Sequence, residues 1–388
     1  MIQTANSTRS LEEQLSDDFI LDKRPLITSA GFSPESDYAG QARQTFSLVL
    51  TEHLIDQIRG QVQSIYDDLI KDCWLSSEPL PFDMIRLDAF LQPTNGVLKV
   101  LEINTRNVGL HEFVEWLDQT VASAIHEQPT GSLNQRFVQN QKLLHSHLFG
   151  TTEPLLYMSP PYLPRWTYLE ELRKAYSNVV HITSVDQARY TNKGIEVAGI
   201  TYRALTKKLA WAATDELKDM DAMGRVRILQ PRWMRQFGLK NYLQQISSPS
   251  ILRSENYTDE HYSRYVDQQD SLVLKIIDGG NSKAVYVGGI FDSQEWQNRL
   301  ATAAQLPEKW VVQDYCQPPV WPVIVHGRGV MNLAVQLGIF VLPDPTNPTQ
   351  FDMDITVKAY AGEDRHFTFD PSGLKPDIWF GHVIKSLA

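Results

Sequence analysis

The amino-acid sequence predicts a mixed α/β fold (α+β) with more than one packed unit, and three observations support this prediction. The chain has 388 residues, which exceeds the size of one ordinary domain. Residues 82–104 contain two segments of alternating pattern around turn residues, which predicts a β-hairpin. Residues 154–184 read as strand, helix and strand, which predicts a small α/β layer.

The remaining elements follow from periodicity and turn residues. Residues 1–40 are polar with proline and serine interruptions, so we expect a loose lead-in, and residues 41–72 carry apolar positions at helical spacing. That segment predicts one long helix or two short ones. Further helices are expected at 110–127, 166–177, 207–224 and 236–246, and further strands at 195–205, 225–233, 272–291, 310–316 and, as a late hairpin, 354–369.

Composition and charge exclude several classes of protein. Lys and Arg total 36 against 46 Asp and Glu, so the net charge of −10 argues against a general nucleic-acid or anionic-membrane surface. No run of 18 apolar residues is present, and the polar N-terminus lacks the apolar core of a signal peptide. The two cysteines, Cys73 and Cys316, have no metal-binding spacing. We therefore expect a cytoplasmic protein with no membrane span.

The predicted hairpin places oxygen ligands on strands that are otherwise apolar. Glu102 and Asn104 are two residues apart, so in a strand their side chains point to the same face. Asp88 would lie opposite Glu102 if residues 94–96 form a three-residue loop with Gly96 left-handed, whereas a two-residue turn would place it on the other face. These oxygens suit Mg²⁺. An ordinary hairpin with a solvated polar face explains the same residues.

A glycine-rich turn follows a lysine in residues 272–289. Lys275 ends an apolar strand, just before Gly-Gly-Asn-Ser at 279–282. Backbone N–H groups of such a turn can approach phosphate oxygens closely, and a lysine adds a positive charge. The segment is not a Walker A loop, because it has no GKS or GKT. A plain β-hairpin with a Gly-Gly turn is the alternative interpretation.

Two weaker candidates complete the set. Residues 310–316, "WVVQDYC", form a predicted strand that runs into Pro318 and Pro319, and its backbone could meet an adenine edge. An ordinary edge strand is the alternative. Lys240 lies in the predicted helix 236–246, where most lysines are simply solvated. No G-x-S-x-G or HExxH pattern is present, so the sequence offers neither a serine-nucleophile motif nor this zinc motif.

The order of these short motifs resembles the ATP-grasp ligases. "RLD", an Asn-Gly turn, "VLEIN", a small α/β segment, "LVLK" with its glycines and "VVQDY" follow one another within residues 82–317. This arrangement is similar to the permuted branch that includes glutathionylspermidine synthetase and eukaryotic glutathione synthetase. The chain departs from that branch at Leu87, where an aromatic residue is usual, at residues 105–109, and in the lid, which lacks a Ser-Arg-Glu-Gly run.

The resemblance implies a role for each matching residue. Asp88, Glu102 and Asn104 would hold Mg²⁺ on ATP, and Arg86 would face the phosphoryl or acyl-phosphate group. Lys240 and Lys275 would contact the ATP phosphates. The remaining ATP-binding residues would be a lid and a strand exit beside adenine: Gly279, Gly280, Asn281, Ser282, Gln313, Asp314, Tyr315 and Cys316. Among the late basic residues, the sequence does not choose between Arg328, Lys358 and Arg365.

The resemblance also implies an organisation and an activity. We expect an ATP-grasp fold with a small Rossmann-like layer: residues 1–150 with the hairpin, packed against the C-terminal part; 151–235 as the small α/β domain; and 236–388 as the nucleotide-binding part with its lid. The implied activity is an ATP- and Mg²⁺-dependent carboxylate–amine ligase acting on a small acid and a small amine. A decayed scaffold protein and a small-molecule kinase are the alternatives. The sequence identifies neither substrate, nor whether the chain forms a homodimer.

Overall fold

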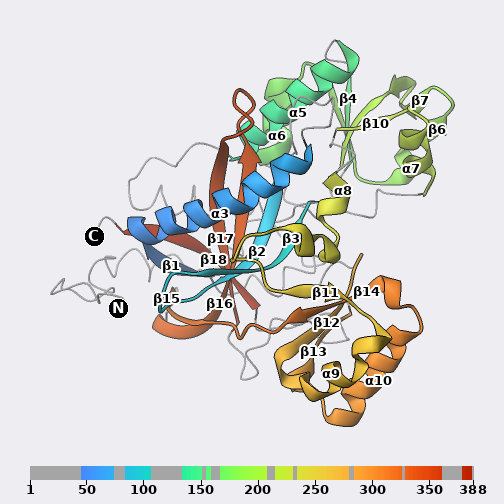
Figure 1. Cartoon of the computed structure of the whole chain (residues 1–388). Coiled ribbons are helices and arrows are strands. Elements are labelled where there is room, and N and C mark those ends of the chain that lie inside the picture. Colours follow the sequence, from blue (N-terminus) through green and yellow to red (C-terminus); the bar gives the residue numbers. More distant parts are fainter. Residues whose placement is uncertain are drawn as a thin grey trace.

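A computed structural model describes ten segments of the chain: residues 45–73, 84–105, 133–150, 154–158, 167–207, 215–229, 234–278, 284–325, 328–360 and 378–386. Three bodies are visible in Figure 1: a large sheet crossed by a long helix, a small α/β layer at the upper right, and a smaller sheet with two helices at the lower right. None of the described helices is both long and apolar enough to cross a membrane.

The large sheet joins early and late parts of the chain. Its seven strands run in the order β15-β1-β18-β17-β16-β2-β3. They are β1 (Thr45–Thr51), β2 (Ile85–Leu91), β3 (Leu98–Asn104), β15 (Val320–Val325), β16 (Gly329–Pro343), β17 (Phe351–Tyr360) and β18 (Ile378–Ser386). The strands after residue 320 therefore belong to the same sheet as β1 and β2.

The two faces of this sheet differ in chemistry. Helix α3 (Glu52–Cys73) runs along one face, as Figure 1 shows, and buries apolar side chains such as Ile58, Ile65 and Leu69 in the main core. Leu87, Leu337 and Val357, from three neighbouring strands, belong to the same core. Side chains alternate along a strand, so the residues between them lie on the opposite face. That opposite face carries the site residues described below.

Part of the predicted helix at 41–72 is wrong. Residues 45–51 form strand β1, which pairs in parallel with β18, and only residues 52–73 are helical. Phe46, Leu48 and Leu50 are fully buried and alternate with Ser47 and Val49, which is the period of a strand. This alternation covers only a few residues, and pairing with a strand more than 300 residues away stabilises β1 as a strand.

The hairpin of β2 and β3 has the predicted pairing but reaches it in another way. Asp88 lies opposite Glu102, and Gly96 has φ +67°, as predicted. The predicted three-residue loop is wrong, because Leu91 pairs with Leu98 across a longer connection. Ala89 pairs with Val100, and the register shifts by one residue between Ala89 and Asp88. Leu101 is thus the extra residue of a β-bulge, and the bulge sets the two carboxylates opposite each other.

The small α/β layer confirms the predicted strand, helix and strand after residue 154. Strand β4 (Leu155–Met158) pairs in parallel with β5 (Val179–Ile182) and β9 (Ala204–Lys207), and β9 pairs in parallel with β10 (Arg227–Ile228). Helices α5 (Leu133–Phe149), α6 (Thr167–Ala175) and α7 (Asp215–Ala222) belong to this layer, as does the meander β6 (Arg189–Thr191), β7 (Gly194–Val197) and β8 (Ile200–Tyr202). The described part of the segment predicted as a strand at 225–233 pairs only over the two residues of β10.

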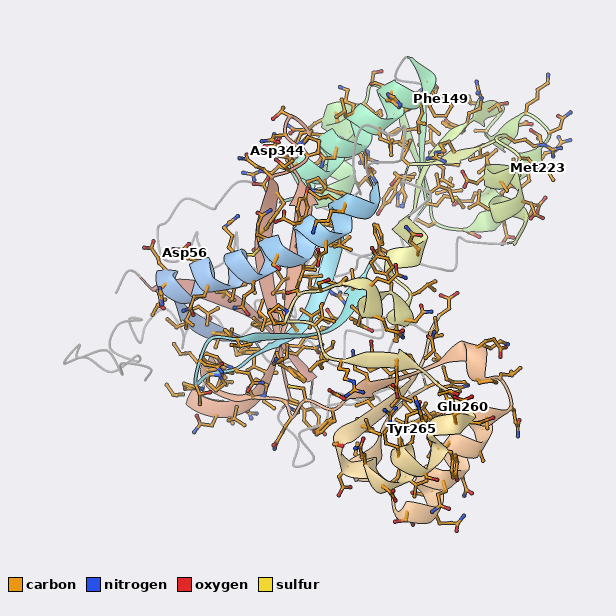
Figure 2. All side chains as sticks on the ribbon, in the orientation of Figure 1. Asp56, Phe149, Met223, Glu260, Tyr265 and Asp344 are labelled. Atoms are coloured by element: carbon orange, nitrogen blue, oxygen red, sulfur yellow. The ribbon has the colours of Figure 1, made fainter. Side chains whose placement is uncertain are left out.

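The third body is an antiparallel sheet in the order β11-β14-β12-β13. Its elements are β11 (Ser254–Asn256), α9 (Tyr262–Asp267), β12 (Leu272–Ile276), β13 (Val285–Val287), α10 (Ser293–Ala304) and β14 (Trp310–Asp314). One face packs on α9 and α10 around the buried Trp296 and Tyr265, and Figure 2 labels Tyr265 inside this body and Glu260 nearby. The connection from the small layer contains α8 (Met234–Phe237) and the 3₁₀ helix η3 (Lys240–Gln245), where one helix was predicted.

Two glycines near α3 provide a test of this fold. Gly96 has a left-handed φ, and a Cβ there would lie 2.3 Å from Gln57 Oε1, so Gly96→Ala should destabilise the protein by about 1–3 kcal/mol. Gly60 lies within α3 with no atom near a new Cβ, so Gly60→Ala should stabilise by about 0.5–1 kcal/mol. Urea denaturation of both variants measures the contrast, and equal effects would contradict the described hairpin loop.

Candidate functional site

The centre of the site is a buried ion pair on β2. Arg86 and Asp88 are two residues apart on one strand face. The Arg86 guanidinium donates two hydrogen bonds to the Asp88 carboxylate, from Nε to Oδ1 at 2.7 Å and from Nη2 to Oδ2 at 3.1 Å. Both side chains are buried. Burial raises the pKa of Asp88, but the charges of Arg86 and Lys358 together with hydrogen bonds lower it further, to about 2. Asp88 is therefore ionised at any physiological pH.

A glycine on the neighbouring strand makes room for this pair. Gly338 of β16 lies directly opposite Asp88. A Cβ at that position would come within 2.7 Å of Thr356 Cγ2 and 3.3 Å of Arg86 Cδ. The aliphatic part of Arg86 therefore lies over the backbone of β16, where any other residue would crowd it.

Lys358 approaches the ion pair from the strand beyond. It lies on β17 opposite Gln336, two residues from Thr356, which pairs with Gly338, so its side chain shares the face of Asp88. Burial lowers the pKa of Lys358, and Arg86 adds to that effect, while the carboxylates of Asp88 and Glu102 raise it. Of the three late basic residues left open above, Arg328 is exposed in the turn before β16 and Arg365 lies outside the described residues, so the structure brings Lys358 to the site.

Glu102 and Asn104 lie on β3 beside the ion pair. Glu102 is partly exposed, its Oε2 is 4.0 Å from the Nζ of Lys240, and its Oε1 is 3.5 Å from the Nδ2 of Asn104. Asn104 also lies opposite Arg86 and donates to the Arg86 backbone carbonyl at 3.5 Å. The predicted trio of Asp88, Glu102 and Asn104 is therefore brought onto one face.

The bulge at Leu101 connects this hairpin to the smaller sheet. The Leu101 carbonyl accepts a hydrogen bond from Lys275 Nζ at 3.4 Å and another from Gln313 Nε2 at 3.3 Å. Lys275 also donates to Gln313 Oε1 at 2.6 Å. A bulge removes one residue from the ladder, so its backbone groups are available for partners outside the sheet. The two sheets thus meet at the residue that precedes Glu102.

Lys275 is a buried lysine whose hydrogen-bond acceptors carry no charge. Burial is the main cause that lowers its pKa, and the positive charge of Lys240 adds to it, while Glu102 and Asp88 oppose the shift; the resulting pKa is about 8. Its hydrogen-bond acceptors, the Gln313 amide and the Leu101 carbonyl, are both neutral. An anionic ligand near the Lys275 ammonium would supply the missing charge.

The strand exit after β14 carries the residues that were predicted to lie beside adenine. The Gln313 side chain accepts a hydrogen bond from Lys275 and donates one to the Leu101 carbonyl. The backbone N–H groups of Asp314 and Tyr315 donate to Arg253 and Ser271 carbonyls. Cys316 is half-buried, and its sulfur lies 3.5 Å from Gln92 Nε2 at the hairpin loop. The predicted lid, Gly279, Gly280, Asn281 and Ser282, lies outside the described residues.

The donor set fits Mg²⁺. Two carboxylates and one amide oxygen face a common region, and Mg²⁺ is usually held by one or two carboxylates plus phosphate oxygens and water. Arg86 occupies one edge of the Asp88 carboxylate, which leaves its outer lone pairs for a cation. Within the described part of the chain, no group of three His, Cys, Asp or Glu residues could hold a metal alone.

Two matched substitutions test the geometry of the hairpin. Asp88→Asn removes the carboxylate that Arg86 grips in a buried setting, so it should lower the free energy of unfolding by about 3–5 kcal/mol. Glu102→Gln changes a partly exposed carboxylate whose nearest cation is 4.0 Å away, so the melting temperature should stay level or rise. Thermal melts of both variants at pH 7 give the comparison.

The same pair of variants has a signature in acid. Because the pKa of Asp88 is lowered on folding, its stabilisation is complete above the ordinary value of 3.8 and is lost as the pH falls toward 2. Asp88→Asn should therefore flatten the loss of stability over this range, and Glu102→Gln should not. A larger thermal loss for Glu102→Gln than for Asp88→Asn would contradict the described ion pair.

Comparison with known proteins identifies the fold. Neither the protein-family models nor the curated proteins match this sequence. Among solved structures, a glutathione synthetase-like effector from Globodera pallida, in its apo form, is similar with a TM-score of 0.57 and 12% identity, over 97% of this chain and 98% of that one. A provisionally named gamma-glutamylcysteine synthetase from Methylobacillus flagellatus has a TM-score of 0.43 and 10% identity, over 84% and 88% of the two chains. The chain therefore shares a glutathione synthetase-like mixed α/β fold.

Proposed function

We propose that this protein is an ATP-dependent carboxylate–amine ligase that forms an amide bond through an acyl phosphate. The observation that carries the proposal is the arrangement of charge at the junction of the two sheets. Lys240 and Lys275 lie by Glu102, and Arg86 and Lys358 lie by Asp88, so each of two facing carboxylates has a pair of cations beside it. Transfer of a phosphoryl group requires this kind of neutralisation around several oxygens.

The nucleotide would lie on the side of the smaller sheet. Lys275 is a buried ammonium with neutral hydrogen-bond acceptors, and Lys240 is buried beside Glu102. Both ammonium groups would attract phosphate oxygens, because a lysine carries a compact positive charge. Asp88, Glu102 and Asn104 would hold Mg²⁺, which would neutralise the negative charge of the phosphate groups.

The acid would lie on the side of the large sheet. Arg86 and Lys358 lie by Asp88 on one face of β2, β16 and β17, and Gly338 leaves room there for the Arg86 side chain. Arg86 would orient the substrate carboxylate and then the acyl phosphate, and Lys358 would contribute a second positive charge. No covalent intermediate with the protein is needed, because the amine attacks the acyl phosphate and inorganic phosphate leaves.

Two alternatives differ from this proposal in what they release. A small-molecule kinase on the same fold would form ADP from the acceptor alone, without an amine. A scaffold protein on this fold would bind no Mg-ATP. An enzyme is favoured over a scaffold because four site residues are intact: Asp88, Glu102, Asn104 and Lys275. Burial of the Lys275 ammonium costs folding free energy, and buried lysines with a lowered pKa are found mostly at functional sites.

The assay that separates these functions uses hydroxylamine as the amine. A panel of small carboxylic acids is incubated with Mg-ATP and hydroxylamine, and both ADP and hydroxamate are measured. A ligase should give hydroxamate and ADP in equal amounts for at least one acid, since hydroxylamine traps the acyl phosphate. Equal ADP release with and without the amine, and no hydroxamate, would favour the kinase, and no Mg-ATP binding would favour the scaffold.

Glu102→Gln tests the magnesium role within that assay. The substitution keeps the volume and one carbonyl oxygen but removes the charge that a hard cation prefers. Turnover should fall on the order of 10²-fold or more, which corresponds to a barrier increase of roughly 2.7 kcal/mol. Lys309→Met, at an exposed position outside the site, serves as the control and should retain full turnover. Full turnover of Glu102→Gln would overturn the metal role.

Lys275 gives the proposal a dependence on pH. Its pKa is about 8 against an ordinary 10.5, and a bound phosphate would raise it, so Mg-ATP binding should take up a proton above pH 8. The affinity should therefore fall as the pH rises through 8 to 9, and Lys275→Met should bind weakly with a flat profile. Calorimetric titrations in buffers of different ionisation enthalpy measure the proton uptake. An affinity for wild type that is constant from pH 7 to 9.5 would contradict this role.

A further inference from the structure

The contact between Lys275 and Gln313 is a closed arrangement of three groups. Lys275 donates to Gln313 Oε1 at 2.6 Å, Gln313 Nε2 donates to the Leu101 carbonyl at 3.3 Å, and Lys275 donates to the same carbonyl at 3.4 Å. The two side chains come from β12 and β14, where Val273 pairs with Gln313 and Lys275 pairs with Val311. Lys275 and Gln313 are thus diagonal neighbours on one sheet face.

The chemistry of the acceptor matters as much as its position. A buried ammonium is stabilised most by a carboxylate, and Gln313 has nearly the shape of a glutamate. The amide holds the ammonium in place without cancelling its charge, and its N–H group can also donate to Leu101, which a carboxylate could not do. A glutamate would instead pair with the lysine and repel phosphate oxygens.

We propose that Gln313 is a positioning residue that fixes the Lys275 ammonium at the Leu101 carbonyl through a neutral acceptor, and so keeps the lysine charge available for a phosphate group. The inference rests on the proposed function only in the identity of the ligand, a nucleoside triphosphate. Because Leu101 immediately precedes Glu102, the same contacts hold the carboxylate of the large sheet in register with the lysine of the smaller sheet.

The first experiment compares Gln313→Glu with wild type by calorimetric titration of Mg-ATP and of inorganic tripolyphosphate. We expect the affinity for both ligands to fall at least 10-fold, while the melting temperature without ligand stays within a few degrees, because the new carboxylate pairs with Lys275. Gln141→Glu is the matched control: Gln141 is equally buried and donates to Thr206 Oγ1 in the small α/β layer, so its substitution should leave both affinities unchanged. A Gln313→Glu protein that binds both ligands as tightly as wild type would overturn the proposal.

The second experiment is a double-mutant cycle that needs no ligand. Gln313→Leu leaves the Lys275 ammonium buried without its shortest hydrogen bond, so the melting temperature should fall by several degrees. Adding Lys275→Met removes the buried charge, so the double variant should melt higher than Gln313→Leu alone. If the stability losses of the two single variants simply add in the double variant, Gln313 stabilises the sheet independently of Lys275. That result would overturn the proposal.

The outcomes separate this proposal from the proposed ligase activity. If no acid gives hydroxamate but Gln313→Glu weakens tripolyphosphate binding and the cycle shows coupling, the positioning role holds and the ligase assignment fails. If wild type binds neither Mg-ATP nor tripolyphosphate, the phosphate part of the inference is wrong, whatever the melting temperatures.

Discussion

The β-bulge at Leu101 is the feature on which the candidate site depends. Between the loop and Ala89 the hairpin runs in one register, and without the extra residue Asp88 would lie opposite Leu101 instead of Glu102. The bulge moves Glu102 opposite Asp88 and turns the Leu101 carbonyl toward Lys275 and Gln313. One irregular residue therefore sets the carboxylate pair and also joins the two sheets. Bulges next to sites that bind ligands are a recurrent use of this irregularity.

Electrostatics explains why such a junction suits an anionic ligand. The Asp88 carboxylate, whose pKa is about 2, forms an ion pair with Arg86, so the charges of these two residues are balanced without a ligand. Lys275 and Lys358 have lowered pKa values because burial is only partly offset by the carboxylates. A phosphate or carboxylate ligand would add the negative charge that offsets these lysines. Because the cations are already in position, few side chains would need to move when such a ligand reacts.

Local sequence patterns predicted the parts of this site that depend on neighbouring residues. Alternation identified β2 and β3, and the two-residue spacing of Glu102 and Asn104 placed them on one face. The same alternation in β17 places the polar Thr356 and Lys358 on the face opposite the apolar Ile355 and Val357, so it could have singled out Lys358.

Contacts between distant segments were not accessible in this way. The alternation of Phe46, Leu48 and Leu50 in β1 was missed, and its partner β18 follows more than 300 residues later, beyond the reach of a local pattern. The role of Gly338 depends on Arg86, some 250 residues earlier, and that of Gln313 depends on the Leu101 carbonyl. Neither dependence leaves a local pattern.

The most direct test of this account is the position of a bound metal and nucleotide. Crystals grown with Mn²⁺ and a non-hydrolysable ATP analogue would locate the metal by its anomalous scattering. We expect a peak between the carboxylates of Asp88 and Glu102, with phosphate oxygens within hydrogen-bond distance of Lys275 Nζ. A metal peak or a nucleotide bound elsewhere, with these carboxylates and Lys275 making no contact to either, would contradict it.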